Sequence, residues 1–219
     1  MLNIAVFASG QGSNFEKIIE GVKDGLILGR VNVLITDRDN INAIEIAKRN
    51  DIPSVILVPS LYNREADYTS DILKYLAVYN VNFILLAGYL KKIPAMIVDC
   101  YRMSMINIHP SLIPLYSGKG YYGDHVFEMV LNNHESESGI TIHFVDEFYD
   151  HGQIIFQKRI DIKQGEDISS LKLRTRQLEH IFYPIITGLF SRGMILYEGD
   201  CVTISEAGSD FIERFSHTQ

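Results

Sequence analysis

The chain has 219 residues, 47% hydrophobic and 21% charged, and these proportions are typical of a folded globular protein rather than a disordered one. Its net charge of −7 argues against a general nucleic-acid-binding surface, because phosphate binding requires clustered Lys and Arg. Cys100 and Cys201 are the only cysteines, which excludes a disulfide framework and a cysteine-rich metal site.

Short apolar and β-branched runs alternate with segments of helical period in the first half of the chain. The runs predict strands over 3–8, 31–36, 54–58, 83–87 and 104–109, and the intervening segments predict helices over 13–24, 43–50, 64–79 and 94–100. This order is typical of parallel βαβ units. We therefore expect an α/β fold built on a Rossmann-like, doubly wound, mostly parallel sheet.

The pattern changes after Pro110. A Gly- and Tyr-rich segment over 116–123 precedes a predicted helix over 124–132, and two alternating runs over 139–145 and 153–160 predict antiparallel additions to the sheet near its C-terminal part. A long helix over 167–192 and a short strand pair, 195–197 and 202–204, follow. We expect one domain over 1–193, with 194–219 as its C-terminal extension.

The location expected from the sequence is the cytoplasm. No run approaches the roughly 20 apolar residues that cross a bilayer. Residues 1–7 read as a strand and lack the basic start of a secretory signal. We therefore expect an enzyme that does not bind a membrane.

Two polar residues, Asn107 and His109, lie two positions apart at the end of the fifth predicted strand, just before Pro110. Residues i and i+2 of a strand share a face, and ligands bind at the carboxyl ends of parallel strands. An amide and an imidazole there can donate hydrogen bonds to a developing oxyanion, which is the outline of an acyl-transfer site. The other interpretation is a core histidine bonded to a backbone carbonyl, and spacing alone does not decide between the two.

Two further segments can complete such a site. Gly10 and Gly12 follow the first strand and precede a helix, so their turn either exposes backbone amides to a single phosphate or is a tight turn with Ser13 or Asn14 as N-cap. The acidic loop over 146–152 either carries a carboxylate that favours the imidazolium form of His109 or is a solvated connection.

The remaining histidines give no sign of a metal site. His143 lies within an apolar strand, and we interpret it as structural. The sequence has no H-E-x-x-H or comparable ligand spacing, so no catalytic metal is expected.

Four motifs resemble, in the same order, those of the folate-dependent glycinamide ribonucleotide formyltransferases. They are Ser9-Gly10-Gln11-Gly12-Ser13-Asn14, Leu86-Ala87-Gly88-Tyr89, Asn107-Ile108-His109-Pro110-Ser111-Leu112-Ile113-Pro114, and His143-Phe144-Val145 leading to Asp150. The resemblance covers 3–193 and implies the formyltransferase fold. It also implies transfer of a formyl group from 10-formyltetrahydrofolate to the amine of glycinamide ribonucleotide in purine synthesis.

The same resemblance implies a role for each matching residue. His109 is the acid and electrostatic stabiliser, Asn107 an oxyanion donor, and Asp150 the carboxylate that supports the charge of the histidine. The positions that match the family's binding residues are, for glycinamide ribonucleotide, Gly12, Ser13, Asn14, Arg176, Gln177, Leu178 and Glu179, and, for folate, Arg64, Leu90, Lys91, Lys92, Ile93, Asn107, Asp146, Glu147, Phe148, Tyr149 and Asp150. Folate is expected as a cosubstrate, with no tightly bound cofactor, no metal, small-molecule partners only, and a monomer or homodimer.

Related activities stay possible at this point. They include a formyltetrahydrofolate deformylase, a methionyl-tRNA formyltransferase, a sugar-nucleotide formyltransferase and a non-catalytic folate- or nucleotide-binding protein. The first two normally carry an additional domain that does not fit in this length. Three departures from the family pattern stand out: the segment 115–125, His151 directly after Asp150, and Arg176 at a position that is often less basic.

Overall fold

The computed structural model describes residues 1–198 and 201–216 of the chain. The expected extension over 194–219 includes 199–200 and 217–219, which lie outside the described residues. The chain divides into two compact units, Met1–Ile106 and Asn107–Gln219, and each is described by itself. The expected domain over 1–193 stays a prediction.

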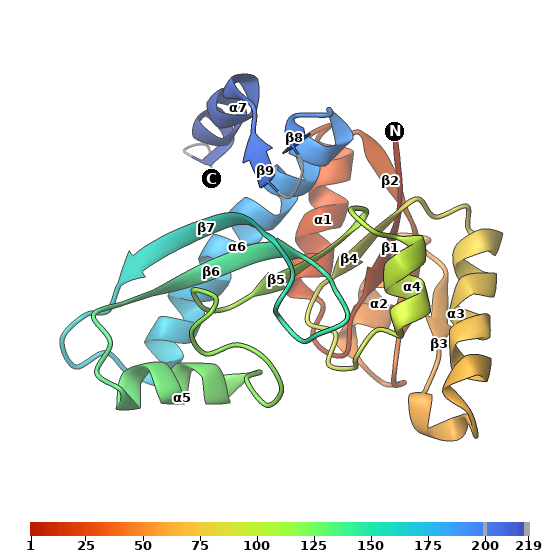
Figure 1. The fold of residues 1–219 in the computed structure, drawn as a ribbon, viewed down its shortest axis with the longest axis horizontal. Coiled ribbons are helices and arrows are strands. Elements are labelled where there is room, and N and C mark those ends of the chain that lie inside the picture. The colour runs from red at the N-terminus through yellow and green to blue at the C-terminus, as the bar shows by residue number, and fades with distance from the viewer. Residues whose placement is uncertain (199–200, 217–219) are drawn as a thin grey trace. The chain divides into compact units, whose positions relative to one another are not determined.

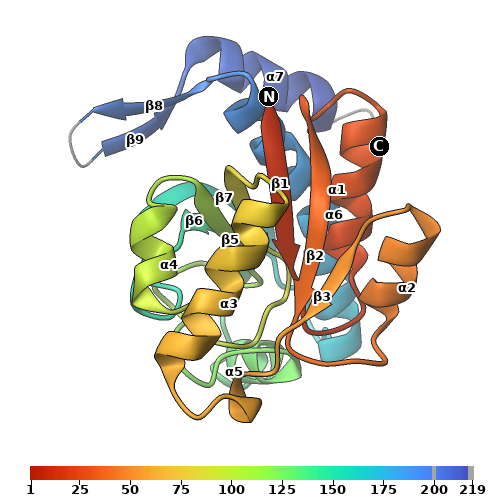
Figure 2. The ribbon, with the colours of Figure 1, turned by 90° about the vertical axis from the view of Figure 1, so that its right-hand side faces the viewer.

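The first unit contains a parallel sheet with helices on both faces. Its strands are β1 (Leu2–Phe7), β2 (Gly29–Thr36), β3 (Ser54–Ile56) and β4 (Phe83–Leu86), in the order β3-β2-β1-β4. Its helices are α1 (Ser13–Lys23), α2 (Asn42–Arg49), α3 (Glu65–Val78) and α4 (Ala95–Cys100), with a 3₁₀ helix at Pro59–Leu61. Figure 2 shows α1 and α2 on one face of these strands and α3 and α4 on the other. The predicted doubly wound parallel sheet is confirmed in this unit.

The strand β1 is buried on both faces because helices cover each side of the sheet. Ile4, Ala5, Val6 and Phe7 are fully buried. A strand covered on both faces reads as a continuous apolar run rather than an alternating one. This is why the sequence of β1 predicts a strand but not which helix covers which face.

The second unit combines antiparallel strands with helices. The strand β5 (Met105–His109) runs from the end of the first unit into the second, and α5 (Asp124–Asn132), β6 (Glu137–Phe144), β7 (Ile154–Asp161), α6 (Ile168–Ser191), β8 (Ile195–Glu198), β9 (Cys201–Ile204) and α7 (Glu206–Ser216) follow (Figure 1). The strand β6 lies between β5 and β7 and pairs antiparallel with β7, as predicted. The helix α6 packs against β6, β7, α5 and α7. Within the described ranges, no helix is both long and apolar enough to cross a membrane.

The helix α7 is an element that the sequence did not predict. Its larger apolar side chains, Phe211, Ile212 and Phe215, lie on one side of the helix, and none of them is fully buried. The rings of Phe211 and Phe215 lie 4.6 Å apart, and the guanidinium of Arg192, at the end of α6, lies 4.7 Å from the Phe211 ring. This side of α7 therefore packs against α6.

Gly152 stands where the backbone leaves no room for a side chain. It ends the acidic loop, and a Cβ built there would overlap the carbonyl oxygen of Phe144 at the end of β6. The N–H of Phe144 also donates to the carbonyl of Gln153 at 2.9 Å. Gly152 and Gln153 therefore hold the end of the loop against Phe144, where β6 ends.

We predict that Gly152→Ala lowers the free energy of unfolding by about 1–3 kcal/mol, because the added methyl group forces the loop away from β6. The matched control is Gly10→Ala, since a Cβ at Gly10 meets no atom within 4 Å and its backbone is not left-handed. Urea unfolding of both variants measures the difference. Equal stability of the two variants would contradict the close approach at Gly152.

Candidate active site

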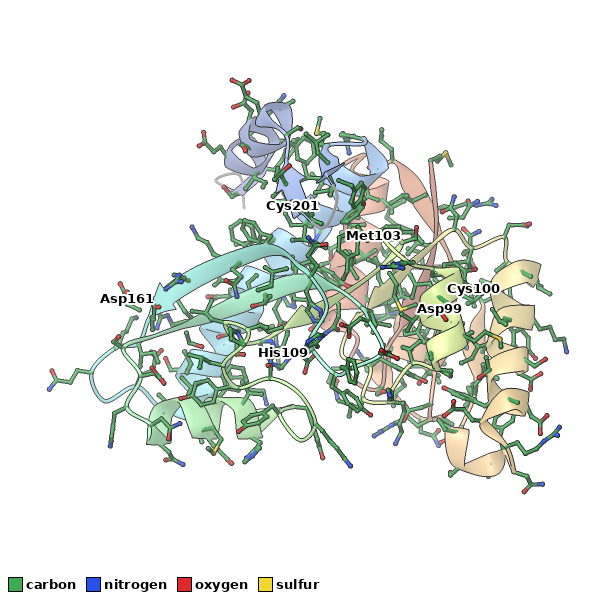
Figure 3. All side chains as sticks on the ribbon, in the orientation of Figure 1. Asp99, Cys100, Met103, His109, Asp161 and Cys201 are labelled. Atoms are coloured by element: carbon green, nitrogen blue, oxygen red, sulfur yellow. The ribbon has the colours of Figure 1, made fainter. Side chains whose placement is uncertain are left out.

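The strand β5 presents Asn107 and His109 at its carboxyl end. They alternate with Ile106 and Ile108, which are buried, so both polar side chains lie on the other face. His109 is 4% exposed, and Figure 3 labels it at the point where β5 ends. The shared face expected from the i, i+2 spacing is present.

The carboxylate of Asp150 joins these two side chains. Its Oδ1 accepts a hydrogen bond from Nδ2 of Asn107 at 3.2 Å, and its Oδ2 lies 3.5 Å from Nδ1 of His109. The backbone N–H of Gly118 donates to the same Oδ2 at 3.0 Å. The structure therefore brings Asn107, His109 and Asp150 together as one contiguous cluster.

The second ring nitrogen of His109 is held by the backbone. Nε2 lies 2.8 Å from the carbonyl oxygen of Tyr116, and because a carbonyl only accepts, Nε2 carries the hydrogen. Nε2 therefore donates to Tyr116, and Nδ1 faces the carboxylate of Asp150. The backbone contact of a core histidine is thus present together with the carboxylate contact of a functional one.

The first residues of the segment 115–125, which departs from the family pattern, contact this cluster. Tyr116 supplies the carbonyl for His109 and Gly118 the amide for Asp150, and both have left-handed backbones, with φ of 52° and 91°. The hydroxyl of Tyr116 donates to a carboxylate oxygen of Glu135 at 2.6 Å and accepts from Nδ2 of Asn133 at 2.8 Å. These two contacts anchor the start of the segment just beyond the end of α5.

His143 on β6 contacts the cluster directly. Its Nε2 lies 3.1 Å from Nδ2 of Asn107 and 3.8 Å from Oδ1 of Asp150, and its Nδ1 lies 2.7 Å from the carbonyl oxygen of Phe144. Burial lowers the pKa of His143, which keeps the ring neutral at neutral pH. The pairing of β6 with β7 shifts register between Ile142 and His143, as at a bulge.

The interpretation of His143 as structural agrees with its burial, and the sequence also carries a signal for its contact with the cluster. Thr141 and His143 are polar residues at i and i+2 between apolar ones, the same pattern that marks Asn107 and His109. Thr141 also supports the motif: its hydroxyl donates to the carbonyl of Ser111 at 2.7 Å. The polar side chains of β6 therefore lie beside the polar end of β5 and the turn that follows it.

The acidic loop is braced by its own side chains. Asp146 accepts a hydrogen bond from the N–H of Phe148 at 2.9 Å and lies 2.6 Å from Nδ1 of His151, so the residue that departs from the family pattern supports the loop. Phe148 and Tyr149 are 60% and 40% exposed, and Glu147 is exposed as well. Of the predicted folate residues in this loop, only Asp150 belongs to the cluster.

The expected phosphate loop lies at the start of α1, in the first unit. The helix begins at Ser13, and Gly12 is its N-cap, with φ 75°. A Cβ at Gly12 would lie 2.8 Å from Cβ of Ala43, so the loop passes close to α2. The N-cap is therefore Gly12 rather than Ser13 or Asn14, and no side-chain hydrogen bond from this residue caps the helix.

The other folate positions in the first unit differ in exposure. Arg64 precedes α3 and donates to a carboxylate oxygen of Asp67 at 2.6 Å, and Leu90 and Lys92 are exposed. Lys91 lies 3.7 Å from Asp37 and lines a cavity of about 390 Å³ with it. Ile93 is 4% exposed, so its side chain packs in the core and only its backbone can face a ligand.

The predicted substrate positions on α6 lie in the second unit. Arg176 and Gln177 are exposed, and Leu178 and Glu179 are half-buried. Across 1–198 and 201–216, no group of His, Cys, Asp and Glu is arranged to hold a metal ion.

The chain also matches known proteins over most of its length. A family model described as formyl transferase matches residues 2–187. The chain belongs to the formyl transferase family. Curated relatives of this formyl transferase include phosphoribosylglycinamide formyltransferase of Bacillus subtilis, 36% identical over 88% of this chain and 98% of the relative. The chloroplastic phosphoribosylglycinamide formyltransferase of Arabidopsis thaliana is 38% identical over 92% of this chain and 69% of the relative.

A solved structure gives the same result. Glycinamide ribonucleotide transformylase 1 from Symbiobacterium toebii is similar to this formyl transferase with a TM-score of 0.87 and 30% identity, over 94% of this chain and 95% of that one. The family and the fold class expected from the motifs are both confirmed.

We predict that acid destabilises the wild-type formyl transferase more steeply than a His143→Gln variant. The folded state holds His143 neutral with a lowered pKa, whereas the unfolded chain protonates it near the ordinary value of 6.5. Below that pH the unfolded state binds more protons than the folded state, so the free energy of unfolding falls as pH falls. Chemical unfolding at about pH 7 and about pH 5 measures the two slopes. Equal slopes would contradict a neutral, buried His143.

Proposed function

We propose that this formyl transferase transfers the formyl group of 10-formyltetrahydrofolate to the amine of glycinamide ribonucleotide. The products are formylglycinamide ribonucleotide and tetrahydrofolate, as purine synthesis requires. The observation that carries the proposal is the cluster of Asn107, His109 and Asp150, in a chain whose relatives are phosphoribosylglycinamide formyltransferases.

The nucleophile in this reaction belongs to the substrate. The amine nitrogen attacks the formyl carbon, and the electron pair of the C=O bond moves to oxygen. The tetrahedral oxyanion then collapses as the bond from carbon to N10 of folate breaks, N10 gains a proton, and the attacking nitrogen loses one. No covalent enzyme intermediate is needed, which agrees with Ser111, whose hydroxyl donates to the carbonyl of Leu115 at 2.8 Å and has no basic partner among the contacts described.

The cluster supplies the stabilisation that the oxyanion needs. Asn107 donates through its amide, and His109 donates through Nδ1, because its Nε2 is already engaged by Tyr116. Asp150 supports the positive charge of His109 across 3.5 Å. Nδ1 is also the nitrogen that can pass a proton toward N10, directly or through a water molecule. One buried donor at a developing oxyanion is typically worth about 10²–10³ in rate.

Binding of the two substrates is assigned to the residues that match the family. Gly12, Ser13 and Asn14 bind the phosphate of glycinamide ribonucleotide, where the positive end of the α1 dipole and the first-turn amides attract an anion. Glu179 holds the glycinamide end, and Arg176, Gln177 and Leu178 contact the same substrate.

Folate is a cosubstrate that binds and leaves, so no cofactor is held tightly. It contacts Arg64, the stretch 90–93, Asn107 and the loop 146–150. The exposed rings of Phe148 and Tyr149 give that loop an apolar surface for a flat pteridine ring.

The cellular setting follows from the same assignment. We propose a cytoplasmic enzyme, a monomer or homodimer, whose partners are small molecules. The net charge of −7 supports the absence of a nucleic-acid partner.

We predict formyl transfer from 10-formyltetrahydrofolate to glycinamide ribonucleotide by the purified protein, with hydrolysis to water much slower. His109→Ala should lower turnover by about 10²-fold or more, because it removes a positioned acid and an oxyanion donor. The change in folate absorbance measures total loss of the formyl group, and the amount of formylated product shows how much of it went to glycinamide ribonucleotide rather than to water.

The control for this measurement is His134→Asn, which removes an exposed histidine outside the cluster and suits the left-handed backbone there, with φ 53°. It should keep wild-type turnover. Transfer to water alone would point to a deformylase, and near-normal turnover of His109→Ala would remove the histidine from the mechanism.

We predict that Asp150→Asn lowers kcat by about tenfold or more, because the neutral amide no longer supports the positive charge of His109 when that ring donates to the oxyanion. Asp161→Asn is the matched control, because Asp161 is an exposed carboxylate at the end of β7 (Figure 3). The role of Asp150 is refuted if the two variants have the same kcat.

A further inference from the structure

The amide of Asn107 donates both of its hydrogens within the cluster. Nδ2 lies 3.1 Å from Nε2 of His143 and 3.2 Å from Oδ1 of Asp150. A carboxylate oxygen only accepts, so the contact with Asp150 requires Nδ2 and not Oδ1 on that side. In this orientation the other hydrogen of Nδ2 points to Nε2 of His143, which must accept it.

The backbone decides which nitrogen of His143 accepts. Nδ1 lies 2.7 Å from the carbonyl oxygen of Phe144, which can only accept, so Nδ1 carries the hydrogen. In a neutral ring the other nitrogen, Nε2, then has a lone pair and accepts from Asn107. A protonated ring would instead aim an N–H at the amide hydrogens and remove this acceptor.

The surroundings of His143 favour the neutral ring. The side chain is 2% exposed, and the charged or titratable groups that face it are Asp150 at 3.8 Å, His109 and Asp146. The carboxylates favour a charged ring and His109 opposes it, but desolvation by burial outweighs these effects.

We propose that His143 is a positioning residue for formyl transfer, which holds the amide of Asn107 so that its second N–H points toward the reacting oxygen. This inference rests on the proposed function. When the oxyanion forms, it replaces Oδ1 of Asp150 as acceptor of the second Asn107 hydrogen, while His143 keeps the first. If His143 cannot accept, the amide is free to turn, and its Oδ1 then repels the oxyanion instead of stabilising it.

The test compares two substitutions of His143. His143→Gln keeps an acceptor, since Oε1 of glutamine reaches the position of Nε2, whereas His143→Leu fills the space without one. His143→Leu should lower kcat about tenfold or more, with KM for either substrate changed less than about threefold, because the defect lies in orientation at the transition state. His143→Gln should restore kcat to within about threefold of wild type.

Stability separates this role from a merely structural one. Leucine suits a buried position at least as well as glutamine, so His143→Leu should be the more stable variant and the slower enzyme. The proposal is overturned if the more stable of the two variants is also the faster enzyme. It is also overturned if both variants are equally slow, or if both keep the wild-type kcat.

A spectroscopic measurement on the unmodified protein covers the case in which a variant fails to fold. The ¹⁵N spectrum of ring-labelled histidine should show His143 protonated at Nδ1 and unprotonated at Nε2 at neutral pH. A hydrogen on Nε2 would overturn the proposal. Because this measurement needs no substrate, it stands even if the wild-type protein transfers no formyl group, an outcome that would refute the proposed function alone.

Discussion

The carboxylate of Asp150 is the group on which the rest of the cluster depends. A carboxylate that is only 14% exposed is costly unless hydrogen bonds and charge replace its water. Here the amide of Asn107 and the backbone N–H of Gly118 donate to it, and His109 faces it. Each of these contacts also fixes its partner. Two of the groups that stabilise the carboxylate, Asn107 and His109, are also those proposed to act on the formyl oxygen. Their contacts with Asp150 therefore orient them.

The backbone supplies the precision that these side chains need. Asp150 has a left-handed backbone, with φ 49°, and it lies in a loop that Gly152 returns tightly to the strand pair. On the other side, the left-handed residue Tyr116 turns its carbonyl toward His109. The register shift before His143 brings that ring beside Asn107. Strand ends and irregular turns, rather than the regular parts of the elements, therefore bring the reacting groups to one place.

Much of the fold was predictable, because apolar runs and helical periods determine which segments can be buried. The pair Asn107 and His109 was also predictable, since side chains two apart on a strand share a face. Asp150 was not: spacing pointed only to an acidic loop, and the resemblance to the family selected the residue. The contacts of the Tyr116 carbonyl and the Gly118 amide could not be predicted, because every residue carries such backbone groups. Only the folded turn shows which of them contact His109 and Asp150. The helix α7 was missed although Phe211, Ile212 and Phe215 follow a helical spacing, because most residues of that stretch are polar.

In the proposed mechanism, Asn107 and His109 donate to the oxygen of the formyl group, with Asp150 beside Nδ1 of the histidine. The most direct test is a crystal structure with glycinamide ribonucleotide and a folate analogue whose carbonyl group cannot be transferred. We expect the carbonyl oxygen within hydrogen-bond distance of Nδ2 of Asn107 and Nδ1 of His109, with His143 still bonded to the amide. A carbonyl oxygen away from both donors, or one that faces Oδ1 of Asn107, would contradict this mechanism.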